Sequence, residues 1–116
     1  AIAEEIDDVG EEEYHRLESA LRVLMLHLLK WDHQPERRSR SWTLSIQEHR
    51  RRAQRQLLRS PGLKSQLDDA LTAAYEDARL EAAGETGLPM RLIPATRPFH
   101  YAEIMERSIV WPGDEA

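Results

Sequence analysis

The chain has 116 residues, 41% of them hydrophobic, and no cysteine. A chain of this length forms one domain around one core, and it needs no disulfide or metal for stability, so we expect a single domain over residues 1–116 and no cofactor. The absence of cysteine excludes thiol catalysis and thiolate metal sites. The net charge of −5 argues against a protein that binds nucleic acid over its whole surface.

The first apolar series extends from Ile2 to Trp31. Its members recur at steps of three and four residues, except near Glu13, which predicts one long amphipathic helix. Gly10 costs about 1 kcal/mol relative to alanine in a helix interior, so we expect a kink or a break there. Between Val23 and Leu29 only His27 is polar, which predicts that this helix is the central one.

The chain starts at Ala1 without a capping residue ahead of Ile2, so we expect that an N-terminal segment is missing. This start is acidic and lacks the pattern of a signal peptide, which favours a cytoplasmic location. The longest apolar runs are far shorter than the roughly 20 residues of a membrane span, so we expect no membrane partner.

A second helix is predicted after a polar connection over residues 32–45, which contains Pro35. Ser45 and Glu48 have the spacing of a capping box, so we expect this helix to begin at Ser45. The Ser60-Pro61 pair predicts its end.

A third helix is predicted over Leu63–Ala83, closed by Gly84 or Gly87. Three prolines then predict an extended segment over residues 88–98, and a short helix is expected over Tyr101–Arg107. Isolated alternating residues are too few to build a sheet. The predicted class is therefore all-α: a long kinked N-terminal helix packed with two further helices, a proline-rich extended segment and a short C-terminal helix.

Charge is unevenly distributed along the sequence. Residues 1–18, the acidic start, contain eight carboxylates and one arginine. Residues 34–59, the arginine-rich segment, contain eight arginines against Glu36 and Glu48. Within it, Arg51, Arg55 and Arg59 recur at one helical turn and form a stripe.

Two hypotheses account for the arginine-rich segment. In the first, its guanidinium groups and the Ser39 and Ser41 hydroxyls bind phosphates while Trp42 stacks on a base. The candidate anion- or partner-binding residues are Arg37, Arg38, Arg40, Trp42, Arg51, Arg52 and Arg55. In the second, which we favour, the stripe faces the acidic start, within one molecule or across a dimer.

Catalytic and metal-binding patterns are weak. Glu12 and His15 have the Glu-x-x-His spacing of di-iron bundles, but no other histidine supplies the second copy, so we expect no metal site. His27 lies in an apolar run and is interpreted as a neutral core histidine. No nucleophilic serine lies in a Gly-x-Ser-x-Gly turn, and the scattered glycines form no phosphate-binding loop. We therefore predict no catalytic residue and lean against an enzyme.

Five segments of the sequence carry a family resemblance: AEEIDDVG at 3–10, HLLKW at 27–31, QPERRSRSW at 34–42, HRRR at 49–52 and ETGLP at 85–89. Together they resemble a bacterial family known as domain of unknown function 29. QPERRSRSW is the most specific of them. The sequence departs from the family pattern at the cap of the last short helix, where it has His100 in place of threonine. The resemblance implies a bacterial cytoplasmic helical domain and no catalytic residues.

Taken together, these patterns favour a non-enzymatic protein–protein interaction or self-association module, whose partner is another protein or a second copy. The alternative is an accessory nucleic-acid or anion-binding protein that uses the arginine-rich segment over residues 37–59.

Overall fold

The computed structural model describes the backbone of residues 2–115 and the side chains of residues 10–115. Within these residues the protein is all-α, as predicted, with no strand. The helices are α1 (Ile2–His33), α2 (Arg40–Arg59), α3 (Leu67–Thr86) and the short α4 (Tyr101–Glu106). Three 3₁₀ turns connect them, η1 (Pro35–Arg37), η2 (Pro61–Gln66) and η3 (Met90–Leu92).

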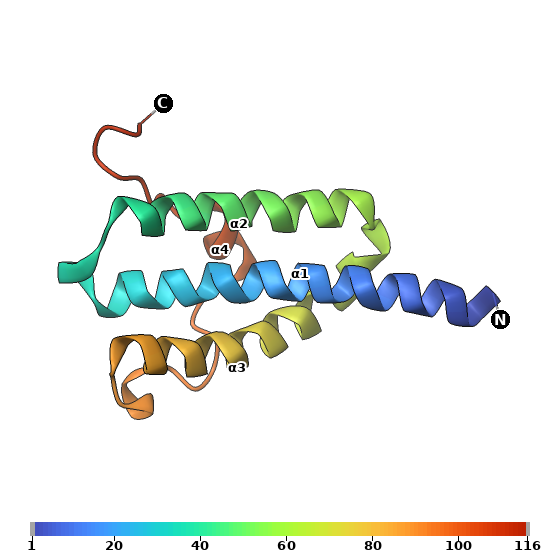
Figure 1. Cartoon of the computed structure of the whole chain (residues 1–116), viewed down its shortest axis with the longest axis horizontal. Helices are drawn as coiled ribbons and strands as arrows, with labels where there is room; N and C mark the ends of the chain where they lie inside the picture. Colours follow the sequence, from blue (N-terminus) through green and yellow to red (C-terminus); the bar gives the residue numbers. More distant parts are fainter. Residues whose placement is uncertain (1, 116) are drawn as a thin grey trace.

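The long helix α1 is central, which confirms the sequence prediction. It lies between α2 and α3 and packs against both (Figure 1). Its inward residues are fully or almost fully buried: Leu17, Leu21, Leu24, Met25, Leu28 and Leu29. Each such side chain contributes roughly 1.5–3 kcal/mol on burial. The facing side of α3 consists mainly of alanines, which let the two helices approach closely: Ala70, Ala74, Ala78 and Ala82.

Helix α1 continues through Gly10, so the predicted break there is wrong. Figure 1 draws α1 without a sharp bend. At the other end of the bundle, α3 ends at Gly87, whose φ of 74° is left-handed, and Gly84 lies inside the helix. This choice follows from the backbone, because a left-handed residue at a helix end favours glycine.

Helix α2 begins five residues earlier than predicted. Its N-cap is Ser39, whose hydroxyl accepts a hydrogen bond of 3.4 Å from the backbone N–H of Trp42. Ser45, the predicted cap, lies inside the helix, and its carbonyl accepts from His49 Nδ1 at 2.8 Å. The hydrophobic pattern did not predict the first turns of α2, because their inward residue is the polar Thr43. Thr43 is fully buried, and its hydroxyl donates to the Arg40 carbonyl.

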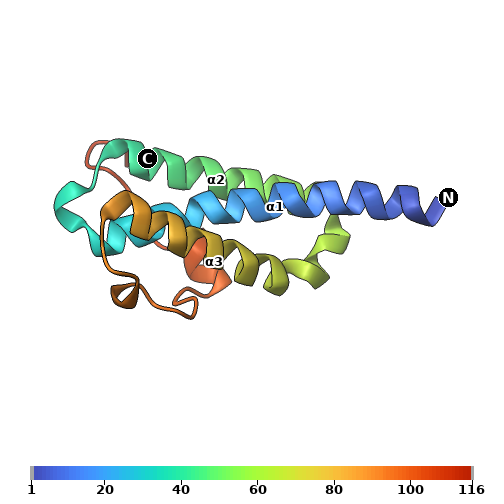
Figure 2. The same ribbon diagram turned by 60° about the horizontal axis from the view of Figure 1, so that its bottom comes forward.

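The N-terminal part of α1 extends beyond the other helices (Figures 1 and 2). Helices α1 and α2 are antiparallel, and the Ser60 hydroxyl at the end of α2 donates to the Glu13 carboxylate. The α1 residues before Glu13 therefore continue past the end of α2, over about 16 Å at 1.5 Å per residue.

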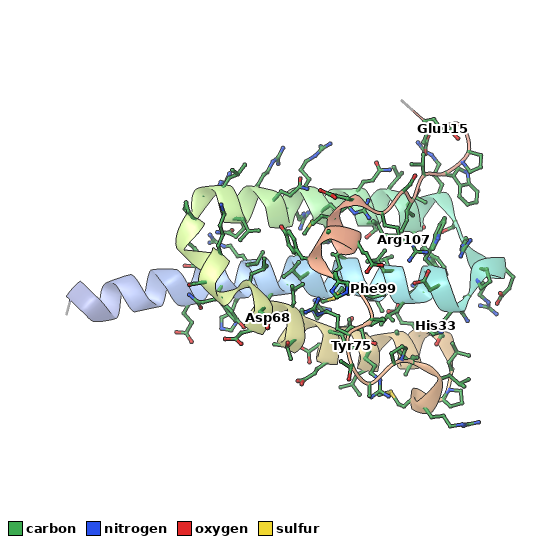
Figure 3. The ribbon with its side chains drawn as sticks, turned by 180° about the vertical axis from the view of Figure 1, so that it is seen from behind. His33, Asp68, Tyr75, Phe99, Arg107 and Glu115 are labelled. Atoms are coloured by element: carbon green, nitrogen blue, oxygen red, sulfur yellow. The ribbon has the colours of Figure 1, made fainter. Side chains whose placement is uncertain are left out.

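The predicted extended segment and short final helix are present, and they return along the bundle. The Tyr75 hydroxyl of α3 donates to the Pro94 carbonyl, and its ring meets Phe99 edge to face at 6.4 Å (Figure 3). Ile104 and Met105 of α4 are buried in the same core. Glu103 accepts the backbone N–H of His100, so the helix start is closed by a carboxylate although no threonine occupies the cap.

Candidate functional site

Arg38 and Arg40 of the arginine-rich segment are bound to other parts of the chain, whereas Arg37 is exposed in η1. Arg38 donates through Nε to the Trp31 carbonyl at 2.9 Å, and its guanidinium lies 4.4 Å from the centre of the Trp31 ring. Arg40 forms two hydrogen bonds with the Asp114 carboxylate, at 2.8 and 3.2 Å. Arg38 therefore binds the connection after α1 to the end of that helix, and Arg40 binds the start of α2 to the C-terminal part of the chain.

Arg50 has a structural role. Its guanidinium donates to the carbonyls of Ile104 and Arg107, at 2.7 and 2.8 Å, at the end of α4. Burial, together with the nearby charge of Arg107, lowers the pKa of Arg50 from its ordinary value. This arginine is therefore committed to the fold and does not belong to a binding surface.

The three arginines of the predicted stripe have no such partners. Among the described side chains, no carboxylate lies within ion-pair distance of Arg51, Arg55 or Arg59, and all three are exposed. The neighbouring Arg52 pairs with Glu48 of its own helix at 2.9 Å. The positive charge of this part of α2 is thus only partly neutralised by described residues.

A groove lies between α1 and α2, with a volume of about 450 Å³. Arginines from both helices line it, and no carboxylate is among its lining residues: Arg16, Ser19, Ala20, Val23, His49, Arg52, Arg55, Gln56 and Arg59. We call this feature the arginine groove. Arg16 also pairs with Glu12, one turn earlier on α1, at 2.5 Å.

Two polar side chains of the arginine groove are held in place by local hydrogen bonds. His49 Nδ1 donates to the Ser45 carbonyl at 2.8 Å, which fixes the imidazole on its own helix. Gln56 is buried, and its amide donates to the Ser60 hydroxyl at 3.2 Å. The groove therefore combines positive charge with fixed polar groups on a short apolar floor of Ala20 and Val23.

A second hollow, of about 400 Å³, lies on the side of α2 that no other helix covers. Its lining residues are Leu44, Gln47, Glu48, Arg51, Arg52 and Arg55. Leu44 is 40% exposed, and Leu58, which follows Arg51 by seven residues, is 80% exposed. We call the row Leu44, Gln47, Arg51 and Leu58 the outer face of α2, because these positions share one side of the helix.

The structure separates the candidate residues into two groups. Arg37, Arg38, Arg40 and Trp42 lie at the turn between α1 and α2, whereas Arg51, Arg52 and Arg55 lie further along α2. Trp42 and Arg55 are about 20 Å apart along the helix axis at 1.5 Å per residue. The Trp42 ring is covered by the Lys30 ammonium at 4.8 Å, and Ser39 is engaged as the helix cap.

Sequence reasoning missed the α1 wall of the arginine groove. Arg16, Ser19 and Val23 share one face of α1 at helical spacing, but nothing in the sequence states which helix that face meets. His49 and Gln56 were likewise not singled out as lining residues.

The acidic start does not neutralise the stripe through its described side chains. Glu12 pairs with Arg16, Glu11 lies 4.0 Å from His15, and Glu13 accepts from Ser60. The earlier carboxylates belong to side chains outside the described residues: Glu4, Glu5, Asp7 and Asp8. Because Glu13 lies against Ser60 at the end of α2, the α1 backbone that bears these four residues lies beyond the end of α2.

The described residues contain neither a metal-binding cluster nor a membrane-spanning helix. No group of three or more histidine, aspartate or glutamate side chains is arranged to hold a metal ion, Glu12 and His15 included. None of the helices traced over residues 2–115 is both long and apolar enough to cross a membrane.

Comparison with known families decides the classification. The family model described as "Domain of unknown function DUF29" matches residues 1–110. The chain belongs to the DUF29 family. Comparison with curated proteins and with solved structures gives no match. The DUF29 domain therefore includes α1 to α4, the arginine groove and the outer face of α2, and its match ends before Trp111.

Proposed function

We propose that this DUF29 chain is a non-enzymatic interaction module that associates with a second copy of itself through the outer face of α2. The observation that carries the proposal is the composition of that face. Leu58 and Leu44 are exposed at either end of it, and Arg51 between them has no carboxylate partner among the described side chains. An arginine without a carboxylate partner, on a helix face that also carries exposed leucines, suits a partner that brings both negative charge and apolar residues.

The partner that we propose for this face is the acidic start of a second copy. Residues 1–18 hold eight carboxylates against one arginine, which complements the basic charge of α2. Ile2, Ile6 and Val9 recur in this segment at helical spacing, so its sequence offers apolar residues as well as charge. The backbone of α1 extends past α2 and is accessible to another molecule (Figure 2). Two copies related by a two-fold axis can exchange these segments reciprocally.

Sedimentation velocity over a range of protein concentrations tests the proposal. We expect a dimer at about 50 mM salt that weakens as ionic strength rises, since salt screens exposed charges beyond a Debye length of about 10 Å at 0.1 M. The double variant R51E/L58S should weaken dimerisation about tenfold or more. The matched control L80S/R91E makes the same changes at exposed positions of α3 and η3 and should leave the dimer intact.

A second variant identifies the docking segment. The quadruple variant E4Q/E5Q/D7N/D8N removes four negative charges from the acidic start and should weaken the dimer as R51E/L58S does. A dimer sensitive to R51E/L58S and insensitive to the quadruple variant would show that another segment covers the outer face. A chain that stays monomeric under all conditions would refute self-association.

Nucleic-acid binding by the arginine-rich segment stays a prediction. Two of its expected features are occupied, because Lys30 covers Trp42 and Asp114 binds Arg40. A labelled single strand that shifts at low salt, with affinity falling steeply as salt rises, would support it.

A further inference from the structure

The arginine groove concentrates positive charge in a protein whose net charge is −5. Arginines line both of its walls, Arg16 on α1 and Arg52, Arg55 and Arg59 on α2. Glu12 and Glu48 pair with Arg16 and Arg52 from outside the lining, whereas Arg55 and Arg59 have no carboxylate partner among the described side chains, so their like charges repel one another. An anion bound in the groove would remove this repulsion.

The guanidinium groups retain donors for such an anion. Arg55 and Arg59 have no carboxylate partner among the described side chains. Arg16 and Arg52 each bind one carboxylate of their own helix, and their side chains are 59% and 62% exposed. A guanidinium has five N–H donors, of which one carboxylate engages at most two. All of the groove's arginines can therefore donate to a ligand.

The arginines are distributed along the groove. Arg52 and Arg59 are two helical turns apart on α2, about 10 Å along the axis, with Arg55 between them and Arg16 on the facing helix. A single tetrahedral anion is too small to contact all of these arginines. A linear chain of adjoining phosphates distributes its negative charge along its length, so it can contact all four arginines when it lies parallel to the row.

The rest of the lining favours phosphates over a nucleic-acid strand. No phenylalanine, tyrosine or tryptophan lines the groove, and its one aromatic ring, His49, is bonded through Nδ1 to the Ser45 carbonyl. The only tryptophan of α2 is Trp42, ten residues before Arg52. Stacking on aromatic rings is the usual source of single-strand affinity beyond charge. The volume of about 450 Å³ lies within the ordinary range for small-ligand sites.

We propose that the arginine groove binds a linear polyphosphate chain through Arg16, Arg52, Arg55 and Arg59, with the Ser19 hydroxyl as an uncharged donor. Arg52 and Arg55 line both the arginine groove and the second hollow, whereas Arg16 and Arg59 line only the groove. A variant at Arg16 and Arg59 therefore changes no residue of the outer face of α2. The polyphosphate could be inorganic or could belong to a nucleoside triphosphate, because both present adjoining phosphates.

Isothermal titration calorimetry with inorganic tripolyphosphate at about 50 mM salt tests the site. We expect saturable binding with one ligand per chain, at least about tenfold tighter than that of orthophosphate, because more charge-assisted hydrogen bonds form. The variant R16Q/R59Q should lose about tenfold or more in tripolyphosphate affinity. The matched control K64Q/R91Q removes the same charge from exposed positions elsewhere and should stay within about twofold of the parent chain.

Further titrations distinguish the sources of the polyphosphate. ATP binding more tightly than tripolyphosphate would identify a nucleotide, and weaker ATP binding would identify an inorganic chain; both support the site. Circular dichroism and sedimentation of R16Q/R59Q should match those of the parent chain, so that loss of binding is separated from unfolding and from loss of the dimer. Absence of saturable tripolyphosphate binding, an equal loss in K64Q/R91Q, or tighter binding of a single-stranded oligonucleotide would overturn the proposal.

Discussion

His27 is the polar residue in the most apolar stretch of α1, and its surroundings favour its neutral form. Burial is the main cause that lowers the pKa of His27 below its ordinary value of about 6.5, and the nearby Lys30 and His49 act in the same direction. The hydrogen bond from Nδ1 to the Val23 carbonyl, at 2.8 Å, and the charge of Glu85 oppose this shift. His27 is half-buried and lies outside the buried core, so the predicted core position is wrong, whereas the lowered pKa favours the predicted neutral form.

The lowered pKa predicts that stability falls in acid. The unfolded chain binds a proton at His27 more readily than the folded chain does, so the free energy of unfolding is highest above about pH 6.5 and declines as pH falls below it. H27L removes this titration. Urea unfolding at pH 7.5 and 5.5 should show a smaller loss of stability for H27L than for the parent chain. Equal losses in the two proteins would contradict the assignment.

The start of α2 shows what hydrophobic periodicity can and cannot predict about an element. Helices α1, α3 and α4 follow from their apolar spacing, and the stripe of Arg51, Arg55 and Arg59 follows from the same geometry. The first turns of α2 do not, because the buried Thr43 reads as a polar position and satisfies its hydroxyl within the helix. The arginine groove was only half predictable, since its second wall, Arg16, comes from a helix whose neighbours the sequence does not specify.

Alanine substitutions of Ser39 and Ser45 distinguish the observed start of α2 from the predicted one. S39A removes the hydroxyl that accepts from the Trp42 N–H, so it should lower the free energy of unfolding by about 0.5–2 kcal/mol. S45A changes a residue inside α2 and should stay within about 0.5 kcal/mol of the parent chain. Urea unfolding measures both. The reverse order, with S45A the more destabilising, would place the helix start where the capping-box pattern predicted it.

Arginines of the helices hold the C-terminal part of the molecule in place. Arg79 of α3 donates to the carbonyls of Met90 and Ile93, at 2.8 and 2.9 Å, and so fixes the extended segment. Arg107 follows α4 and forms two hydrogen bonds with Asp32 of α1, at 2.7 and 3.0 Å (Figure 3). These contacts explain why the abundance of arginine in the sequence does not translate into one basic surface.

Arg50 of α2 binds the end of α4, so its replacement should destabilise α4 as well as α2. R50Q leaves the carbonyls of Ile104 and Arg107 without their charged donor and should lower the free energy of unfolding by about 1.5–3 kcal/mol. The matched control R37Q, at an exposed position of η1, should change it by less than about 0.5 kcal/mol. Hydrogen exchange should accelerate over residues 101–110 in R50Q while the buried part of α1 stays protected. Unchanged exchange in α4, or an equal loss of stability in R37Q, would mean that apolar burial of Ile104 and its neighbours is sufficient to hold α4 on the bundle.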